Sequence, residues 1–159
     1  DCVFAARERH AWCRIEGKGY GSRMIRTKDY LYIRNYNPDR WPSGIDRLVT
    51  NEGPYGDVDR SPTKDYMLKH KEAGKGKALF ELAFGKRPAE ELYDCGKDPF
   101  QMHNLADSPA HHADKQRLSR RLTAYLKKTH DPREASQPVS WDDWPYYGRK
   151  DWTIRPEAE

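Results

Sequence analysis

The 159-residue sequence predicts an α+β fold, in which a small antiparallel β-sheet carries one long C-terminal α-helix, accompanied by short helices. Two observations support this class. Residues that favour strands lie on both sides of a short polar turn, Lys28-Asp29, which is typical of a β-hairpin. Further along, apolar side chains recur at the i, i+4, i+7 and i+8 positions of one helix face. These side chains are Leu118, Leu122, Tyr125 and Leu126.

The first part of the chain predicts strands. Residues 2–6 form a short apolar run that ends at the polar cluster of residues 7–10 and could continue through residues 11–15. Residues 22–27 and 30–36 are expected to form the hairpin. Because side chains alternate along a strand, we expect Leu31 and Ile33 to face the core. The opposite face would then carry Tyr30, Tyr32 and Arg34.

The middle of the chain is irregular. Residues 37–60 are rich in Pro, Gly, Asn and Asp, with Trp41 as a large anchor, and long loops of this kind are often functional. Ser61-Pro62 is a helix start signal, so a helix is expected over residues 62–73, with Gly74 as its stop. A second short helix is expected to end at Gly85.

The C-terminal part predicts a strand, an ordered loop and the long helix. The strand is centred on Leu92-Tyr93, and the helix runs for about five turns between Ser108-Pro109 and Asp131-Pro132. The remaining residues carry five large aromatic side chains without a period, so we expect them to lie over a surface. The predicted organisation is one domain over residues 1–132 and an aromatic-rich irregular tail over residues 133–159.

Composition limits the core and the partners. Apolar residues make up 36% of the chain and charged residues 34%, against about 45–50% and 25% in ordinary domains. The core should be thin, or a neighbour should cover part of the apolar surface. A net charge of +4 suits a polyanionic partner without requiring one. No apolar run reaches roughly 18 residues, so no membrane span is expected.

The sequence shows no convincing metal site. Its three cysteines form no C-x-x-C pair and have no histidine at metal spacing, although one pair could form a disulfide. Asp142-Asp143 lacks the further oxygen ligands that calcium needs and is expected to be a solvated turn. The neighbours His111 and His112 point in different directions on a helix. The glycine run of residues 17–21 lacks the strand and helix of a phosphate-binding loop.

Arg9 and His10 are the best candidates for contact with a substrate. They follow the first predicted strand, where a chain usually reaches the surface. An arginine offers two parallel hydrogen bonds to an oxyanion, and an imidazole can donate or accept. The alternative is that residues 7–9 form a solvated surface and His10 caps a turn.

The pattern E-L-Y-D-x-x-x-D-P-x-x-x-x-N-L-A at residues 91–106 resembles a signature of the sulfatase family. Four further pieces, residues 8–10, 22–35, 80–88 and 129–132, resemble in that order the C-terminal part of sulfatases similar to heparan N-sulfatase (N-sulfoglucosamine sulfohydrolase). The resemblance covers nearly the whole chain. It implies a C-terminal subdomain packed against a larger, N-terminal, alkaline-phosphatase-like catalytic domain.

The same resemblance implies a division of labour. Sulfatases use calcium and a formylglycine that is made from Cys or Ser in a C/S-x-P-x-R motif, and neither Cys2, Cys13 nor Cys95 fits that motif. The chain is therefore expected to hold no catalytic residue and no metal ligand, and to be inactive alone. Arg9 and His10 would bind the substrate of the parent enzyme, a sulfuric ester or sulfamate hydrolase acting on sulfated glycans such as glycosaminoglycans. A periplasmic, extracellular or lysosome-like location is also implied.

A second function class stays open. The chain could be a non-enzymatic, basic polyanion-binding module that uses the hairpin face of Tyr30, Tyr32 and Arg34. Aromatic and basic side chains on a sheet can stack nucleic-acid bases, but the same stripe can pack against a helix or a neighbouring domain. Nucleic acid is not the expected partner.

Overall fold

A computed structural model describes residues 1–134, 141–148 and 152–154. The described residues divide into two compact units. The first contains residues 1–7, 21–36 and 88–134, and the second contains residues 8–20, 37–87, 141–148 and 152–154. Strands and helices both occur, and the main sheet is antiparallel, so the predicted α+β class is confirmed.

The first unit is built on a four-stranded antiparallel sheet. The strands are β1 (Val3–Arg7), β2 (Ser22–Arg26), β3 (Tyr30–Asn35) and β5 (Glu90–Asp94), in the order β1-β2-β3-β5. The predicted hairpin is confirmed as β2 and β3, whose turn is closed by the Thr27 amide donating to the carbonyl of Tyr30 at 2.9 Å. The strands expected near residues 2–6 and 92–93 are also present.

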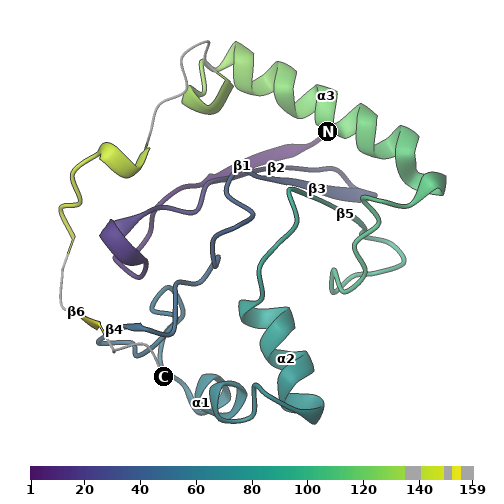
Figure 1. The fold of residues 1–159 in the computed structure, drawn as a ribbon. Helices are drawn as coiled ribbons and strands as arrows, with labels where there is room; N and C mark the ends of the chain where they lie inside the picture. The colour runs from purple at the N-terminus through teal and green to yellow at the C-terminus, as the bar shows by residue number, and fades with distance from the viewer. Residues whose placement is uncertain (135–140, 149–151, 155–159) are drawn as a thin grey trace. The chain divides into compact units, whose positions relative to one another are not determined.

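Helix α3 (His112–Lys128) lies across one face of this sheet (Figure 1). It follows a 3-10 turn, Pro109–His111, so the helix begins near its predicted start signal. Leu118, Leu122 and Leu126 are buried, and they form a core with residues of β2, β3 and β5. The fourth residue of the predicted stripe, Tyr125, lies at the margin and stacks on Phe4 with ring centroids 3.7 Å apart.

The expected orientation of β3 is wrong. Tyr30 packs against the core under α3, and Tyr32 is fully buried in it, while Leu31 and Ile33 lie on the other face and are only partly buried. A tyrosine can be buried when its hydroxyl has an acceptor. The hydroxyl of Tyr32 donates to Oε1 of Glu90 at 2.5 Å, and burial raises its pKa above the ordinary value.

Arg34 shares this face and is also occupied. Its guanidinium donates to the hydroxyls of Ser119 and Thr123 on α3, at 3.0 and 2.9 Å, and to Glu134 at 2.5 Å. The face that the polyanion-binding alternative requires is therefore covered by a helix within the first unit.

The second unit contains α1 (Pro62–Lys69), α2 (Gly74–Phe84), the 3-10 turns Ile15–Gly17 and Trp141–Asp143, and a two-stranded sheet of β4 (Leu48–Thr50) and β6 (Trp152–Ile154). The α1 start is as predicted, because the Ser61 side chain accepts from the Lys64 amide. Its predicted end is wrong. Helix α1 stops at Lys69, and Gly74, with a φ of +58°, begins α2 instead of ending α1. Only glycine adopts that left-handed backbone cheaply.

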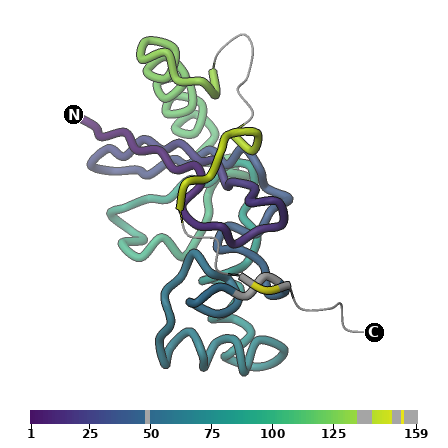
Figure 2. The backbone as a smooth tube through the Cα atoms, turned by 90° about the vertical axis from the view of Figure 1, so that its left-hand side faces the viewer, coloured from purple at the N-terminus to yellow at the C-terminus, as the bar shows by residue number. Residues whose placement is uncertain are grey.

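An aromatic cluster of Tyr55, Phe80 and Phe84 is the core of the second unit. The ring centroids of Tyr55 and Phe84 lie 5.2 Å apart, and burial raises the pKa of Tyr55 to about 12. The sequence suggested that residues 11–15 could extend the first strand. They lead instead into the Ile15–Gly17 turn. The segments 8–20 and 141–148 run side by side (Figure 2), joined by the Gly19 amide donating to Asp142 at 2.8 Å.

None of the helices described has the combination of length and apolar character that crossing a bilayer requires.

Candidate functional site

His10 lies in the second unit, where its ring contacts a buried acid. Nδ1 of His10 is 3.1 Å from Oδ1 of Asp57. The two side chains differ sharply in exposure, because 73% of the His10 side chain is accessible to solvent and only 1% of Asp57 is. Asp57 is thus a buried anchor for an exposed imidazole.

The other contacts of Asp57 fix the role of each histidine nitrogen. Oδ1 also accepts from the Ala11 amide at 3.0 Å, and Oδ2 accepts from Nη2 of the buried Arg14 at 2.9 Å. A carboxylate paired with a guanidinium can only accept, so Nδ1 of His10 carries the hydrogen. Nε2 is then an acceptor in the neutral ring and a donor in the charged ring. The arrangement holds the ring by one edge and leaves Nε2 for another group.

The loop that carries Asp57 is held by Lys64. This lysine is buried in α1, and its ammonium donates to the carbonyls of Glu52, Tyr55 and Val58 at 2.7, 3.2 and 2.6 Å. Three donated bonds use all three ammonium hydrogens. Burial lowers the pKa of Lys64, and the carboxylate of Glu52 works against that change. Lys64 therefore determines the path of residues 52–58 and, through it, the position of Asp57.

Arg9 is bound by backbone carbonyls. Its guanidinium donates to the carbonyls of Gly17, Trp144 and Pro145 at 3.1, 2.9 and 3.0 Å, and it lies 5.1 Å from the ring centroid of Tyr146. These contacts hold residues 144–146 beside the 8–20 loop. Arg9 and His10 are neighbours in sequence with separate sets of partners, and substrate binding by Arg9 stays a prediction.

Asp142 also helps to hold the 141–148 segment against the 8–20 loop, and it is not part of the solvated turn that the sequence suggested. Its carboxylate accepts from Arg40 at 3.1 and 2.7 Å and from the Gly19 amide. Burial pushes the pKa of Asp142 upward, but the hydrogen bonds from Arg40 and Gly19 outweigh burial and leave the pKa below its ordinary value. The carboxylate is a structural anchor for the 141–148 segment.

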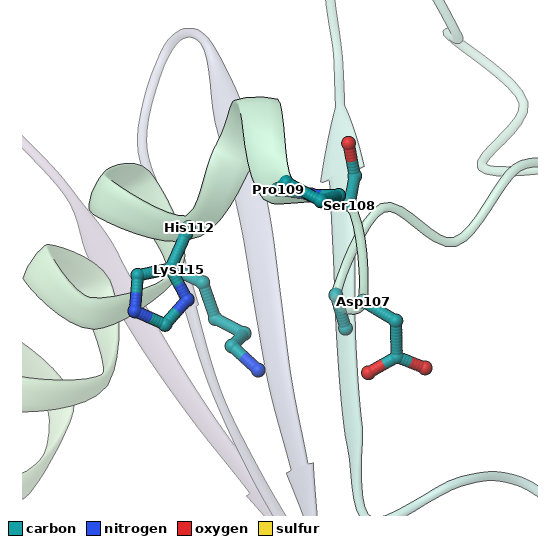
Figure 3. Close-up of a pocket in the computed structure, with 6 residues that line it drawn as sticks. Asp107, Ser108, Pro109, His112 and Lys115 are labelled. Atoms are coloured by element: carbon teal, nitrogen blue, oxygen red, sulfur yellow. The ribbon is translucent and has the colours of Figure 1, made fainter.

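A separate cavity of about 510 Å³ lies in the first unit at the start of α3 (Figure 3). His112 and Lys115 line it from the helix, and Asp107 lines it from the loop that precedes the helix (Figure 3). Lys115 is paired with Glu90 at 3.2 Å, and His112 is 2.7 Å from the Gln116 amide. The basic groups here are thus already engaged, and the cavity is a weaker site than the surroundings of His10.

The sulfatase resemblance implies a calcium ion in the parent enzyme. Among the described residues, no group of three or more His, Cys, Asp or Glu side chains is placed to hold a metal. Calcium takes six to eight oxygen ligands. Within the described part of the chain, then, the side chains form no cluster of the kind that calcium requires.

Asp57, Arg14 and Lys64 were missed from the sequence. Asp57 lies in the irregular stretch of residues 37–60, where an aspartate is an ordinary turn former, so the sequence offers no signal for it. For Lys64 the sequence does contain a signal. Lys64 stands three and four residues before Met67 and Leu68, both of which pack on the aromatic core, so it lies on the apolar side of α1.

Comparisons with known proteins bear on the sulfatase resemblance. No protein-family model matches the chain. Two curated proteins of Formosa agariphila, both named ulvan-active sulfatase, are similar to it. One is 32% identical over 122 residues, which cover 74% of this chain and 18% of that protein. The other is 33% identical over 112 residues, 70% of this chain and 18% of that protein. The chain spans less than a fifth of these relatives, and the similarities support the sulfatase family as the family of this chain without singling out its heparan N-sulfatase-like members.

Proposed function

We propose that this chain is the C-terminal part of a sulfatase that hydrolyses a sulfate ester or sulfamate on a sulfated glycan. Its contribution is His10, which contacts the substrate at the edge of the catalytic pocket. The observation that carries the proposal is the His10–Asp57 pair, in which a buried acid orients an exposed imidazole. Similarity to two sulfatases and the family-like order of the sequence pieces support the reaction class.

The geometry suits recognition of a sulfated sugar. When the His10 ring is neutral, Nε2 can accept a hydrogen bond from a sugar hydroxyl. When the ring is charged, Nε2 can donate to a sulfate oxygen while Nδ1–H still donates to the Asp57 carboxylate. The formylglycine and calcium of the family supply the chemistry at sulfur, and we place them in an N-terminal catalytic domain outside this chain. His10 therefore binds and orients substrate, while the bond to sulfur is broken elsewhere.

The test is His10→Ala in the complete enzyme. Loss of a hydrogen bond to a charged group costs about 1.5–3 kcal/mol, so kcat/KM should fall roughly ten- to a hundredfold. The fall should be larger for an oligosaccharide than for a small aryl sulfate, because a residue at the pocket edge contacts the sugar. Stability should change by no more than about 0.5 kcal/mol, since the side chain is exposed.

His103→Ala is the matched control, because His103 is also exposed but lies in the first unit. This variant should keep the kcat/KM of the parent enzyme for both substrates. If His10→Ala keeps full activity on both substrates while its melting temperature drops, His10 is a structural residue and the proposal fails.

A further inference from the structure

A cavity of about 260 Å³ lies in the second unit. It is lined by two aromatic residues, Trp12 and Tyr146, by the polar residues Thr50, Asn51 and Glu52, and by the small residues Ala11 and Gly56. The volume is slightly below the range of roughly 300–1,000 Å³ that is usual for small-molecule sites. A cavity of this size suits a single small ring more than an extended chain.

The cavity lies next to the His10–Asp57 pair. Ala11, which lines it, donates its amide to the same Asp57 oxygen that His10 contacts. Gly56, on the other side, directly precedes Asp57. A Cβ added at Gly56 would lie 2.5 Å from Oγ1 of Thr50, so the close approach of these two segments requires a glycine. The cavity and the His10–Asp57 pair are therefore built on adjoining backbone, at residues 10–11 and 56–57.

The two aromatic rings offer an apolar wall in a fixed position. Their centroids are 5.6 Å apart and the ring planes are inclined by 52°. Tyr146 is held in place by the Arg9 guanidinium, which lies over its ring and binds the carbonyls of Trp144 and Pro145. Rigid aromatic surface with a few polar groups is the usual make-up of a small-molecule site. The C–H face of a sugar ring is complementary to such a wall.

The polar wall offers hydrogen bonds to hydroxyl groups. The side-chain amide of Asn51 is exposed and has no hydrogen-bond partner among the described residues. Oε2 of Glu52 accepts from the Arg60 amide at 3.0 Å, which leaves Oε1 for a ligand. An amide and a carboxylate can satisfy both the donors and the acceptors of neighbouring hydroxyls.

Charge selects among sugars. Among the described residues that line the cavity, Glu52 alone has a charged side chain, and its carboxylate accepts a hydrogen bond from the neutral backbone amide of Arg60. A second carboxylate or a sulfate brought into this space would be repelled. An uncharged ring would meet no such penalty.

We propose that this cavity binds an uncharged pyranose ring, the sugar that adjoins the sulfated sugar contacted by His10. The place of this ring in the substrate rests on the proposed function. The binding of the ring itself depends only on the side chains that line the cavity.

Saturation-transfer NMR of the protein with simple glycosides tests the binding directly. Methyl β-D-glucopyranoside should receive saturation, and methyl β-D-glucuronide should bind several-fold more weakly. Asn51→Ala should weaken glucoside binding roughly two- to tenfold, as expected for the loss of one neutral hydrogen bond. Glu52→Gln should close most of the gap between the two ligands, because glutamine keeps an acceptor for the Arg60 amide and removes the charge.

Two results would overturn the inference. One is the absence of saturation transfer to the glucoside in the folded protein. The other is equal binding of glucoside and glucuronide that Glu52→Gln leaves unchanged. The measurement is independent of desulfation. Glucoside binding together with full activity of His10→Ala would reject the proposed function alone, whereas an active role of His10 without glucoside binding would reject this inference alone.

Discussion

The ring of the exposed His10 is oriented by the buried Asp57. A mutation of Asp57 can therefore test this orientation while His10 itself is unchanged. Asp57→Asn keeps the shape and replaces an acceptor-only carboxylate by an amide that can also donate. We expect the Nδ1–H tautomer of neutral His10 to lose its dominance, which ¹⁵N chemical shifts of the imidazole would report. Because the buried Arg14 loses its counter-ion and keeps only backbone carbonyls as acceptors, stability should also fall by about 3–5 kcal/mol.

The exposed Asp143 provides the control for that substitution. Asp143→Asn should change neither the tautomer nor the stability. An unchanged Nδ1–H tautomer in Asp57→Asn would show that the acid does not orient the ring.

Lys64 is the second residue whose environment allows a sharp prediction. In Lys64→Met the carbonyls of Glu52, Tyr55 and Val58 lose their shared donor, and each buried group without a partner costs about 1–3 kcal/mol. Thermal or urea unfolding should show a loss of at least that size. Lys69→Met, on an exposed position of the same helix, should stay within about 0.5 kcal/mol of the parent. Similar stabilities for the two variants would contradict the role given to Lys64.

Among the elements, α3 contributes most to the core of the first unit. Leu122 is fully buried between the helix and the sheet. Leu122→Ala should lower the free energy of unfolding by about 2–5 kcal/mol, through lost contacts and the cavity left behind. Its neighbour Arg121 is exposed, and Arg121→Ala should have little effect in the same denaturation experiment. Equal effects would mean that the leucine stripe does not hold the helix to the sheet.

Acid should loosen the junction between α3 and β2. Just beyond α3, Asp131 accepts two hydrogen bonds from Arg23, at 2.7 and 3.1 Å. Burial raises the pKa of Asp131, but the bonds from Arg23 outweigh it, so the pKa lies below its ordinary value. A carboxyl whose pKa is depressed by folding adds stability above its unfolded value of about 3.9, and that stability is lost as the pH falls through the folded pKa. Stability measured against pH should therefore fall less steeply in Asp131→Asn than in the parent or in the exposed-site control Asp107→Asn.

Elements specified by local signals were predictable from the sequence, and those that depend on distant partners were not. The polar turn at Lys28-Asp29 and the leucine spacing predicted the hairpin and α3 correctly. The sequence could not show that Glu90 would lie where it can accept from Tyr32, so the buried face of β3 was predicted the wrong way round. Strands β4 and β6 are three residues long and about a hundred residues apart, too short for a period to appear.

At the scale of the molecule, the chain passes back and forth between its two units. Each unit is assembled from three separate segments of the chain. A sequence pattern describes neighbours along the chain, and the predicted division into residues 1–132 and a tail over residues 133–159, part of which lies outside the described residues, stays a prediction. The same limit applies to the site, where the sequence indicated His10 and the fold added a partner 47 residues away.

The whole-molecule proposal predicts that the 159-residue chain alone has no sulfatase activity. It contains no C/S-x-P-x-R motif, and its described residues hold no metal-ligand cluster. A chromogenic aryl sulfate should show no turnover above a buffer blank, and calorimetric titration with calcium should show no tight site. Turnover by the chain alone, repeated with independently purified protein, would contradict the assignment to a C-terminal part.

The three carbonyl oxygens around Lys64 resemble the sets of backbone carbonyls that coordinate a potassium ion in a channel. A bound ion exchanges with the medium, so its occupancy follows the salt concentration. The ammonium of Lys64 is tethered to the chain, and its effective concentration near the three carbonyls is set by the length of its own side chain. The order of residues 52–58, and the direction in which His10 points, should therefore be the same in fresh water, in brine and in the presence of chelators.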